Sequence, residues 1–94
     1  MTESQALRVM VVDDEPLAVE RLQLLLARSE GVTLVGTAAD GEAGLRIAEA
    51  VRPDLLLLVI AMPGMDGIEV ARELAASAID PAVIFVTAFD NFAV

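Results

Sequence analysis

A run of six apolar residues, LLLLVI at positions 55–60, constrains the fold of this 94-residue chain more than any other feature. The run follows Pro53-Asp54 and gives way to Met62-Pro63-Gly64, which cannot extend a strand. An apolar run of this length between breakers predicts a strand buried on both faces, as in the middle of a parallel sheet. Because ligands of open parallel sheets bind beyond the carboxyl ends of the strands, we expect a site at residues 59–61.

Shorter apolar runs and helical faces alternate along the rest of the chain. The first helix should carry Ala18, Leu22, Leu25 and Leu26 on its apolar face. The order βαβαβαβ with short connections implies a parallel, right-handed, helix-covered sheet of the α/β class in one domain. The remaining elements are predicted as strands at 8–12, 32–38 and 82–87 and helices at 17–27, from Asp40-Gly41 to Pro53, and at about 67–76.

The charge composition excludes several classes of function. The net charge is −9, from 15 acidic residues against six arginines, and the chain contains no lysine, histidine or cysteine. Nucleic-acid binding by this segment would need a basic face, and histidine or lysine catalysis and disulfides are impossible. No apolar run reaches the ~18 residues of a membrane span, and the polar amino terminus is too short for a signal peptide. We therefore expect a cytoplasmic protein that does not enter a membrane.

Polar residues stand at the carboxyl ends of two predicted strands. Asp13 and Asp14 follow the first strand, and Thr87 ends the last. Two carboxylates on a loop suit a hard divalent cation such as Mg²⁺, and the threonine hydroxyl could hydrogen-bond a ligand oxygen. The same acids could instead form an acidic N-cap segment for the first helix, and the threonine could be an ordinary strand residue.

Four segments at these mutual distances together resemble the receiver domain of two-component response regulators: VVDDEP, AADGEAGL, PDLLLLVIAMPGMDG and VIFVTAFD. The resemblance covers nearly the whole chain from Arg8 onward. The ending VTAFDNFAV is most similar to receivers that precede a LytTR-type DNA-binding domain. The family fold is the flavodoxin-like (CheY-like), doubly wound parallel sheet of strand order 2-1-3-4-5, here truncated after the fourth strand.

The resemblance implies a phosphorelay function. A sensor histidine kinase would be the partner, and its phosphohistidine would transfer a phosphoryl group to an aspartate at the end of the third strand. By motif position, Asp14 would bind Mg²⁺ directly, Asp13 would bind it through water, and the backbone carbonyl of Ala61 would complete the protein ligands. Thr87 would hydrogen-bond the phosphoryl group. The domain itself would not be an enzyme.

The sequence departs from the family pattern at two places. Val59 occupies the position of the acceptor aspartate, and valine has no lone pair to attack phosphorus or bind a metal. The chain also stops at Val94, before a fifth strand and the lysine that follows it in the family. We therefore predict an incomplete receiver domain over residues 1–94 that is phosphorylation-deficient and holds Mg²⁺ weakly. Its parent protein would control transcription through an output domain absent here.

Two alternatives and one further expectation remain open. A competent regulator would require another acid to substitute for the acceptor, and Asp66 in the following loop is the candidate, although it suits a helix N-cap. The chain could also be an acidic stand-alone interaction or metal-binding module outside any phosphorelay. The fourth strand, 82–87, has no charge, proline or glycine to discourage pairing, so we expect a homodimer or domain-swapped oligomer through this strand and the 89–94 tail.

Overall fold

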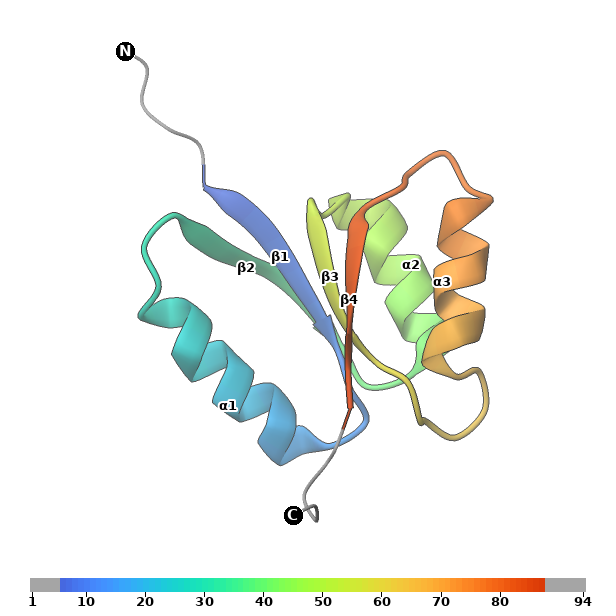
Figure 1. The fold of residues 1–94 in the computed structure, drawn as a ribbon, viewed down its shortest axis with the longest axis horizontal. Helices are drawn as coiled ribbons and strands as arrows, with labels where there is room; N and C mark the ends of the chain where they lie inside the picture. The colour runs from blue at the N-terminus through green and yellow to red at the C-terminus, as the bar shows by residue number, and fades with distance from the viewer. Residues whose placement is uncertain (1–5, 88–94) are drawn as a thin grey trace.

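Four parallel strands alternate with three helices in the computed structural model, which describes residues 6–87 (Figure 1). The α/β class and the predicted order of elements are confirmed. None of the helices in this range is long and apolar enough to cross a membrane. The elements are β1 (Leu7–Val12), α1 (Pro16–Ala27), β2 (Val32–Ala38), α2 (Gly41–Val51), β3 (Leu55–Val59), α3 (Gly67–Ala75) and β4 (Ala82–Val86).

The strands form one sheet in the order β2-β1-β3-β4. Strand β1 pairs with β3 so that Val12 lies beside Leu58. Strand β3 pairs with β4 so that Val59 lies beside Val86. This is the order that the family resemblance implied for these four strands. Because all strands run the same way, their carboxyl ends lie at one edge of the sheet, and the residues that follow β1 and β3 become neighbours there.

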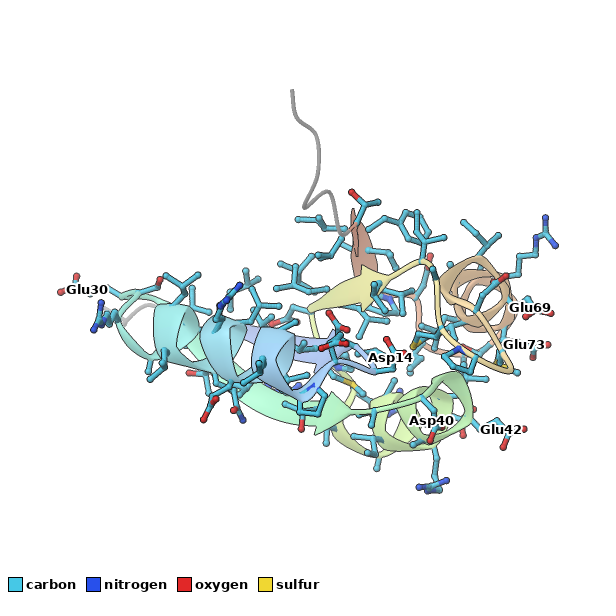
Figure 2. The ribbon with its side chains drawn as sticks, turned by 90° about the horizontal axis from the view of Figure 1, so that it is seen from below. Asp14, Glu30, Asp40, Glu42, Glu69 and Glu73 are labelled. Carbon is cyan, nitrogen blue, oxygen red and sulfur yellow. The ribbon has the colours of Figure 1, made fainter. Side chains whose placement is uncertain are left out.

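The helices cover the two faces of the sheet unequally. Helix α1 lies on one face, whereas α2 and α3 lie together on the other (Figures 1 and 2). The most completely buried side chains between the sheet and the α2/α3 pair are Met10, Val12, Leu56, Leu58, Val70 and Leu74. This layer is almost entirely aliphatic, as expected for a chain with three Phe and no Tyr or Trp. It packs the helices against the sheet and thereby holds in place the edge where the site lies.

The expectation that the third strand is buried on both faces is wrong for alternate residues. Leu56 is fully buried, but Leu55 and Leu57 are only half-buried, because α1 packs on β1 and β2 and leaves β3 less covered on its side. Leu25, which we predicted on the apolar face of the first helix, is 59% exposed, and Ile84 of β4 is 51% exposed. The strand also ends at Val59, one residue earlier than predicted.

Side-chain hydrogen bonds fix both ends of helix α2. At its start, the Asp40 carboxylate accepts the backbone N–H of Ala43 at 2.8 Å, an N-cap of the kind that contributes about 1 kcal/mol. At its end, the Arg8 guanidinium from β1 donates to the carbonyl oxygens of Val51 and Arg52. The backbone N–H of Arg8 also donates to the Asp54 carboxylate at 2.9 Å. The amino end of β1 is thereby tied to the connection between α2 and β3.

Candidate functional site

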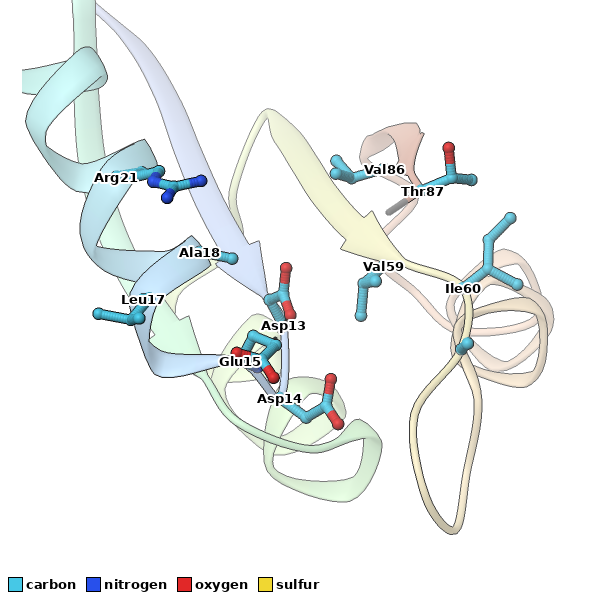
Figure 3. A pocket seen from close by; sticks show the side chains of 11 residues that line it. Asp13, Asp14, Glu15, Leu17, Ala18, Arg21, Val59, Ile60, Val86 and Thr87 are labelled. Atoms are coloured by element: carbon cyan, nitrogen blue, oxygen red, sulfur yellow. Dashed lines mark hydrogen bonds between the residues drawn. The ribbon is translucent and has the colours of Figure 1, made fainter. Parts of the chain in front are cut away.

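A cavity of about 940 Å³ opens at the carboxyl ends of β1, β3 and β4, beneath the first turns of α1 (Figure 3). It contains all five residues that the sequence singled out: Asp13, Asp14, Val59, Ala61 and Thr87. The parallel sheet brings these residues together, because strands whose ends are more than 70 residues apart in the sequence end at the same edge. The other lining residues are Glu15, Leu17, Ala18, Arg21, Ile60 and Val86.

Asp13 and Asp14 have opposite environments. Asp13 is only 6% exposed; its Oδ1 accepts the Glu15 backbone N–H at 2.9 Å, and its own N–H donates to the carbonyl of Ala38. Asp14 is exposed, and its carboxylate extends toward the open side of the cavity (Figure 3). The N-cap of α1 is Glu15, whose side chain makes no capping hydrogen bond. Asp13 therefore supports the N-cap residue of α1 through the Glu15 N–H, and the alternative of an acidic N-cap segment stays open for this residue.

Val59 is the last residue of β3 and is 8% exposed. Its isopropyl group lies in the cavity between the aspartates that follow β1 and the end of β4 (Figure 3). An aliphatic side chain here can neither attack phosphorus nor accept a hydrogen bond. It does relieve the electrostatic repulsion that a third carboxylate would experience beside Asp13.

Ala61 lies in the loop of residues 60–66, and glycine geometry shapes this loop. Gly64 follows Pro63 with φ of +76°, as in a type II turn, which confirms the predicted turn at the Pro-Gly pair. The loop closes where the Gly67 N–H donates to the carbonyl of Ile60 at 2.8 Å. Asp66 is the N-cap of α3 and forms a reciprocal capping box with Glu69, each carboxylate accepting the other residue's backbone N–H at 2.9 Å.

The donor atoms around the cavity limit the kind of metal that fits. Over residues 6–87, no group of three or more histidine, cysteine, aspartate or glutamate side chains is arranged to hold a metal ion. Two carboxylates and one backbone carbonyl are a hard, oxygen-only set, which fits Mg²⁺ with several retained waters, or Mn²⁺ in its place, and not the metals that prefer nitrogen or sulfur ligands. The residues present thus fit Mg²⁺, and weak binding stays a prediction.

Thr87 and Arg21 complete the cavity from opposite sides. Thr87 is exposed directly after β4, and in Figure 3 its hydroxyl is directed away from Val59. Arg21 comes from the second turn of α1 and was not predicted. The sequence could have indicated Arg21 because it comes four residues after Leu17, and residues four apart lie on the same face of a helix. Both side chains line the cavity.

The family model of the response regulator receiver domain matches residues 9–94. The chain belongs to this family. It is 47% identical over 88 residues to the positive alginate biosynthesis regulatory protein of Pseudomonas aeruginosa, covering 93% of this chain and 36% of that protein. It is 38% identical over 88 residues to the transcriptional regulatory protein BtsR of Salmonella typhi, covering 94% of this chain and 36% of that protein. The chain thus spans about a third of these relatives.

Solved receiver structures have the same fold. The signal receiver domain of the putative response regulator NarL from Mycobacterium tuberculosis superposes with a TM-score of 0.85 at 39% identity, covering 93% of this chain and 70% of that one. The response regulator domain of Thermotoga maritima CheB gives 0.83 at 30% identity, covering 93% and 64%. The predicted receiver family and flavodoxin-like fold are confirmed, and a module unrelated to this family is excluded. The individual roles of Asp13, Asp14, Ala61 and Thr87 stay predictions.

Proposed function

We propose that this receiver domain does not accept a phosphoryl group and acts in signal transduction through protein contacts. The observation that carries the proposal is Val59, a buried aliphatic residue in the cavity where the family's phosphoacceptor carboxylate stands. Phosphoryl transfer to a receiver needs a carboxylate oxygen as the nucleophile. A side chain without lone pairs cannot form that bond.

Three acids among the described residues have positions that do not favour them as substitutes for the missing nucleophile: Asp66, Asp13 and Asp14. Asp66 was the candidate, but its Oδ1 accepts the Glu69 N–H in the capping box, at the start of α3. Moving this carboxylate into the cavity would break the hydrogen bond that it accepts from the Glu69 N–H. Asp13 is held by the Glu15 N–H, and with Asp14 it belongs to the proposed cation site.

Asp13, Asp14 and the Ala61 carbonyl would hold Mg²⁺, with Asp14 as the direct carboxylate ligand and Asp13 acting through water. When bound, the ion supplies positive charge that offsets the two carboxylates. Affinity for hard cations rises with the number of charged ligands, so binding by two carboxylates should be weaker than binding by three. Thr87 is the residue proposed to hydrogen-bond an anionic ligand of the cavity, which requires its hydroxyl to rotate from the orientation in Figure 3 toward Val59.

The names of the relatives support a role in the control of transcription. The P. aeruginosa and S. typhi proteins are called regulatory proteins, and this chain covers about a third of each. We place this domain in a cytoplasmic regulator of the same kind, with a LytTR-type DNA-binding output domain outside residues 1–94. A sensor histidine kinase is the proposed partner for docking. This segment itself would bind no nucleic acid and catalyse no reaction.

We also propose that the chain self-associates through β4. Among the described residues, this strand pairs on one side only, with β3. Ile84 and Phe85 are 51% and 40% exposed on its two faces. An uncharged apolar edge strand is a template for pairing with a second chain. The proposed 89–94 part of the contact lies outside the described residues.

Acetyl phosphate labelling tests the central proposal. The chain is incubated with acetyl phosphate and Mg²⁺, and intact-mass spectrometry should show no added phosphoryl group. The matched control is Val59→Asp, which restores a carboxylate at the end of β3 and should show partial labelling. An acyl phosphate on any acidic residue of the unmodified chain would contradict the proposal.

A further inference from the structure

The first residue of helix α2 packs against the loop that carries Ala61. A Cβ added at Gly41 would lie 2.7 Å from the backbone oxygen of Met65, 2.9 Å from its Cβ and 3.0 Å from Cγ2 of Val70. The backbone of Gly41 does not have a positive φ, so its own conformation permits alanine. Glycine is required here because the neighbouring loop leaves no room.

The Gly41 contact differs in kind from those of other glycines packed around α2. A Cβ at Gly44 would meet methyl groups of Val12 at 3.1 Å, and one at Gly36 would meet Cγ2 of Ile47 at 3.1 Å. Those neighbours are side-chain atoms that can shift by a few tenths of an ångström. The nearest neighbour of Gly41 is a backbone oxygen, so relief requires the loop itself to move.

The loop is also anchored on its other side. A Cβ at Gly67 would overlap the carbonyl oxygen of Val59, and the Gly67 N–H holds the Ile60 carbonyl at 2.8 Å. The segment of residues 60–66 is therefore held between the start of α3 and the start of α2. Ala61 lies in this segment and lines the cavity together with Asp13 and Asp14.

We propose that Gly41 is a positioning residue for the cation site. By allowing α2 to approach the Met65 backbone, it keeps the 60–66 loop, and with it the Ala61 carbonyl, beside the two aspartates. The cation part of this inference rests on the proposed function, whereas the loop part does not. Gly41 touches no proposed ligand and acts only through Met65.

The test compares Gly41→Ala with Gly36→Ala, which introduces the same methyl at a site away from the cavity. Amide chemical shifts of residues 61–66 are measured by NMR, and Mn²⁺ is titrated as the probe through line broadening at the amides of Asp14 and Ala61. Gly41→Ala should shift the loop amides and weaken Mn²⁺ binding roughly tenfold, as loss of an outer support typically does. Gly36→Ala should lower the unfolding midpoint while leaving both readouts unchanged.

The sign of the stability change gives a further check. Alanine is a better helix former than glycine, so helix propensity alone would make Gly41→Ala more stable than the unmodified chain. We expect a loss of stability instead, because the added methyl group clashes with the loop. A folded Gly41→Ala protein with unshifted loop amides and unchanged Mn²⁺ binding would overturn the proposal. If Gly41→Ala does not fold, the unmodified chain still tests the contact: nuclear Overhauser effects should connect the Hα protons of Gly41 with the Hβ protons of Met65, and their absence would overturn the proposal.

The two proposals fail in distinguishable ways. If Mn²⁺ broadens no amide near Asp14 in the unmodified chain, the cation site of the proposed function is wrong. The loop shifts in Gly41→Ala still decide whether Gly41 positions the loop, because that readout needs no metal.

Discussion

The two faces of the sheet are built from the same four strands but are buried to different degrees over β3 and β4. On the α2/α3 side, Leu56, Leu58 and Leu74 are at most 1% exposed. On the α1 side, Leu57 is half-buried and Ile84 is half-exposed. The residue types are alike on both faces, so the difference comes from the helices: two pack closely on one side, whereas one lies toward β1 and β2 on the other.

This difference between the faces has a counterpart at the edge of the sheet where the cavity lies. The closed face buries the aliphatic layer that holds the sheet together. The open face continues into the cavity, where Val59 and the aspartates lie. Val59 lines this cavity and also belongs to the same hydrophobic cluster as Leu56 and Leu58, so the core and the cavity meet at this residue.

The largest change in the free energy of unfolding is expected at two adjacent leucines of β3, Leu56 and Leu57, which lie on opposite faces of the sheet. Leu56→Ala should lower the free energy of unfolding by about 2–5 kcal/mol, because it leaves a cavity in a close-packed layer. Leu57→Ala, the matched change on the open face, should cost less than half as much, because its side chain already contacts solvent. Urea denaturation measures both values. Equal losses would show that the open face is as well packed as the closed one.

A smaller effect is expected where the open face meets the site. Val59→Asp should lower the free energy of unfolding by about 1–3 kcal/mol without Mg²⁺, because it buries a carboxylate beside Asp13. Mg²⁺ should recover this loss in Val59→Asp and stabilise the unmodified chain less. Thermal melts with and without Mg²⁺ measure the difference, and Val59→Ala serves as the uncharged control. Equal Mg²⁺ affinity in the parent and Val59→Asp chains would contradict the proposed cation site.

The capping box of α3 should contribute about 1 kcal/mol. Asp66→Ala removes the acceptor for the Glu69 N–H and should lower the unfolding free energy by this amount. Asp80→Ala, which removes an exposed acid outside the helices, is the control and should change stability little. A loss no larger than that of the control would mean that the box contributes nothing in solution.

The smallest change in stability, within about 0.5 kcal/mol, is expected for Ile84→Lys, because the residue is at the surface of the monomer. Its effect should appear instead in the oligomeric state. Light scattering at micromolar concentration should show at least a dimer for the parent chain and a shift toward monomer for the variant. Leu24→Lys on α1, which is 59% exposed, is the control. A monomeric parent chain would refute association through β4.

The sequence was sufficient to predict the fold where local signals agree. Breakers on both sides of β3 and the acids after β1 predicted the strands and the edge at which the site lies, whereas the order of the strands in the sheet came from the family resemblance. Burial on the open face was not predictable in the same way. Leu25 fits the helical periodicity of α1, yet it is exposed, because periodicity indicates which residues share a face and not whether another element covers it.

The composition of the site was predictable only in part. Asp13, Asp14, Val59, Ala61 and Thr87 were found from motif spacing, and all of them line the cavity. The capping role of Asp66 also followed from its position before a helix. Arg21 and the packing of Gly41 were missed, because both depend on how α1 and α2 approach other segments. Contacts between elements distant in sequence leave no local pattern.

The contacts of Arg8 have a consequence for folding during synthesis on the ribosome. Arg8 binds Asp54, 46 residues later in the chain, and β1 lies between β2 and β3 in the sheet. At ~5–20 residues per second, synthesis takes roughly 2–9 s to pass from one partner to the other. Throughout that interval the nascent β1 strand is translated but has no neighbour on its β3 side, so chaperones would have to shield a strand that is fully buried over residues 9–12 in the folded domain.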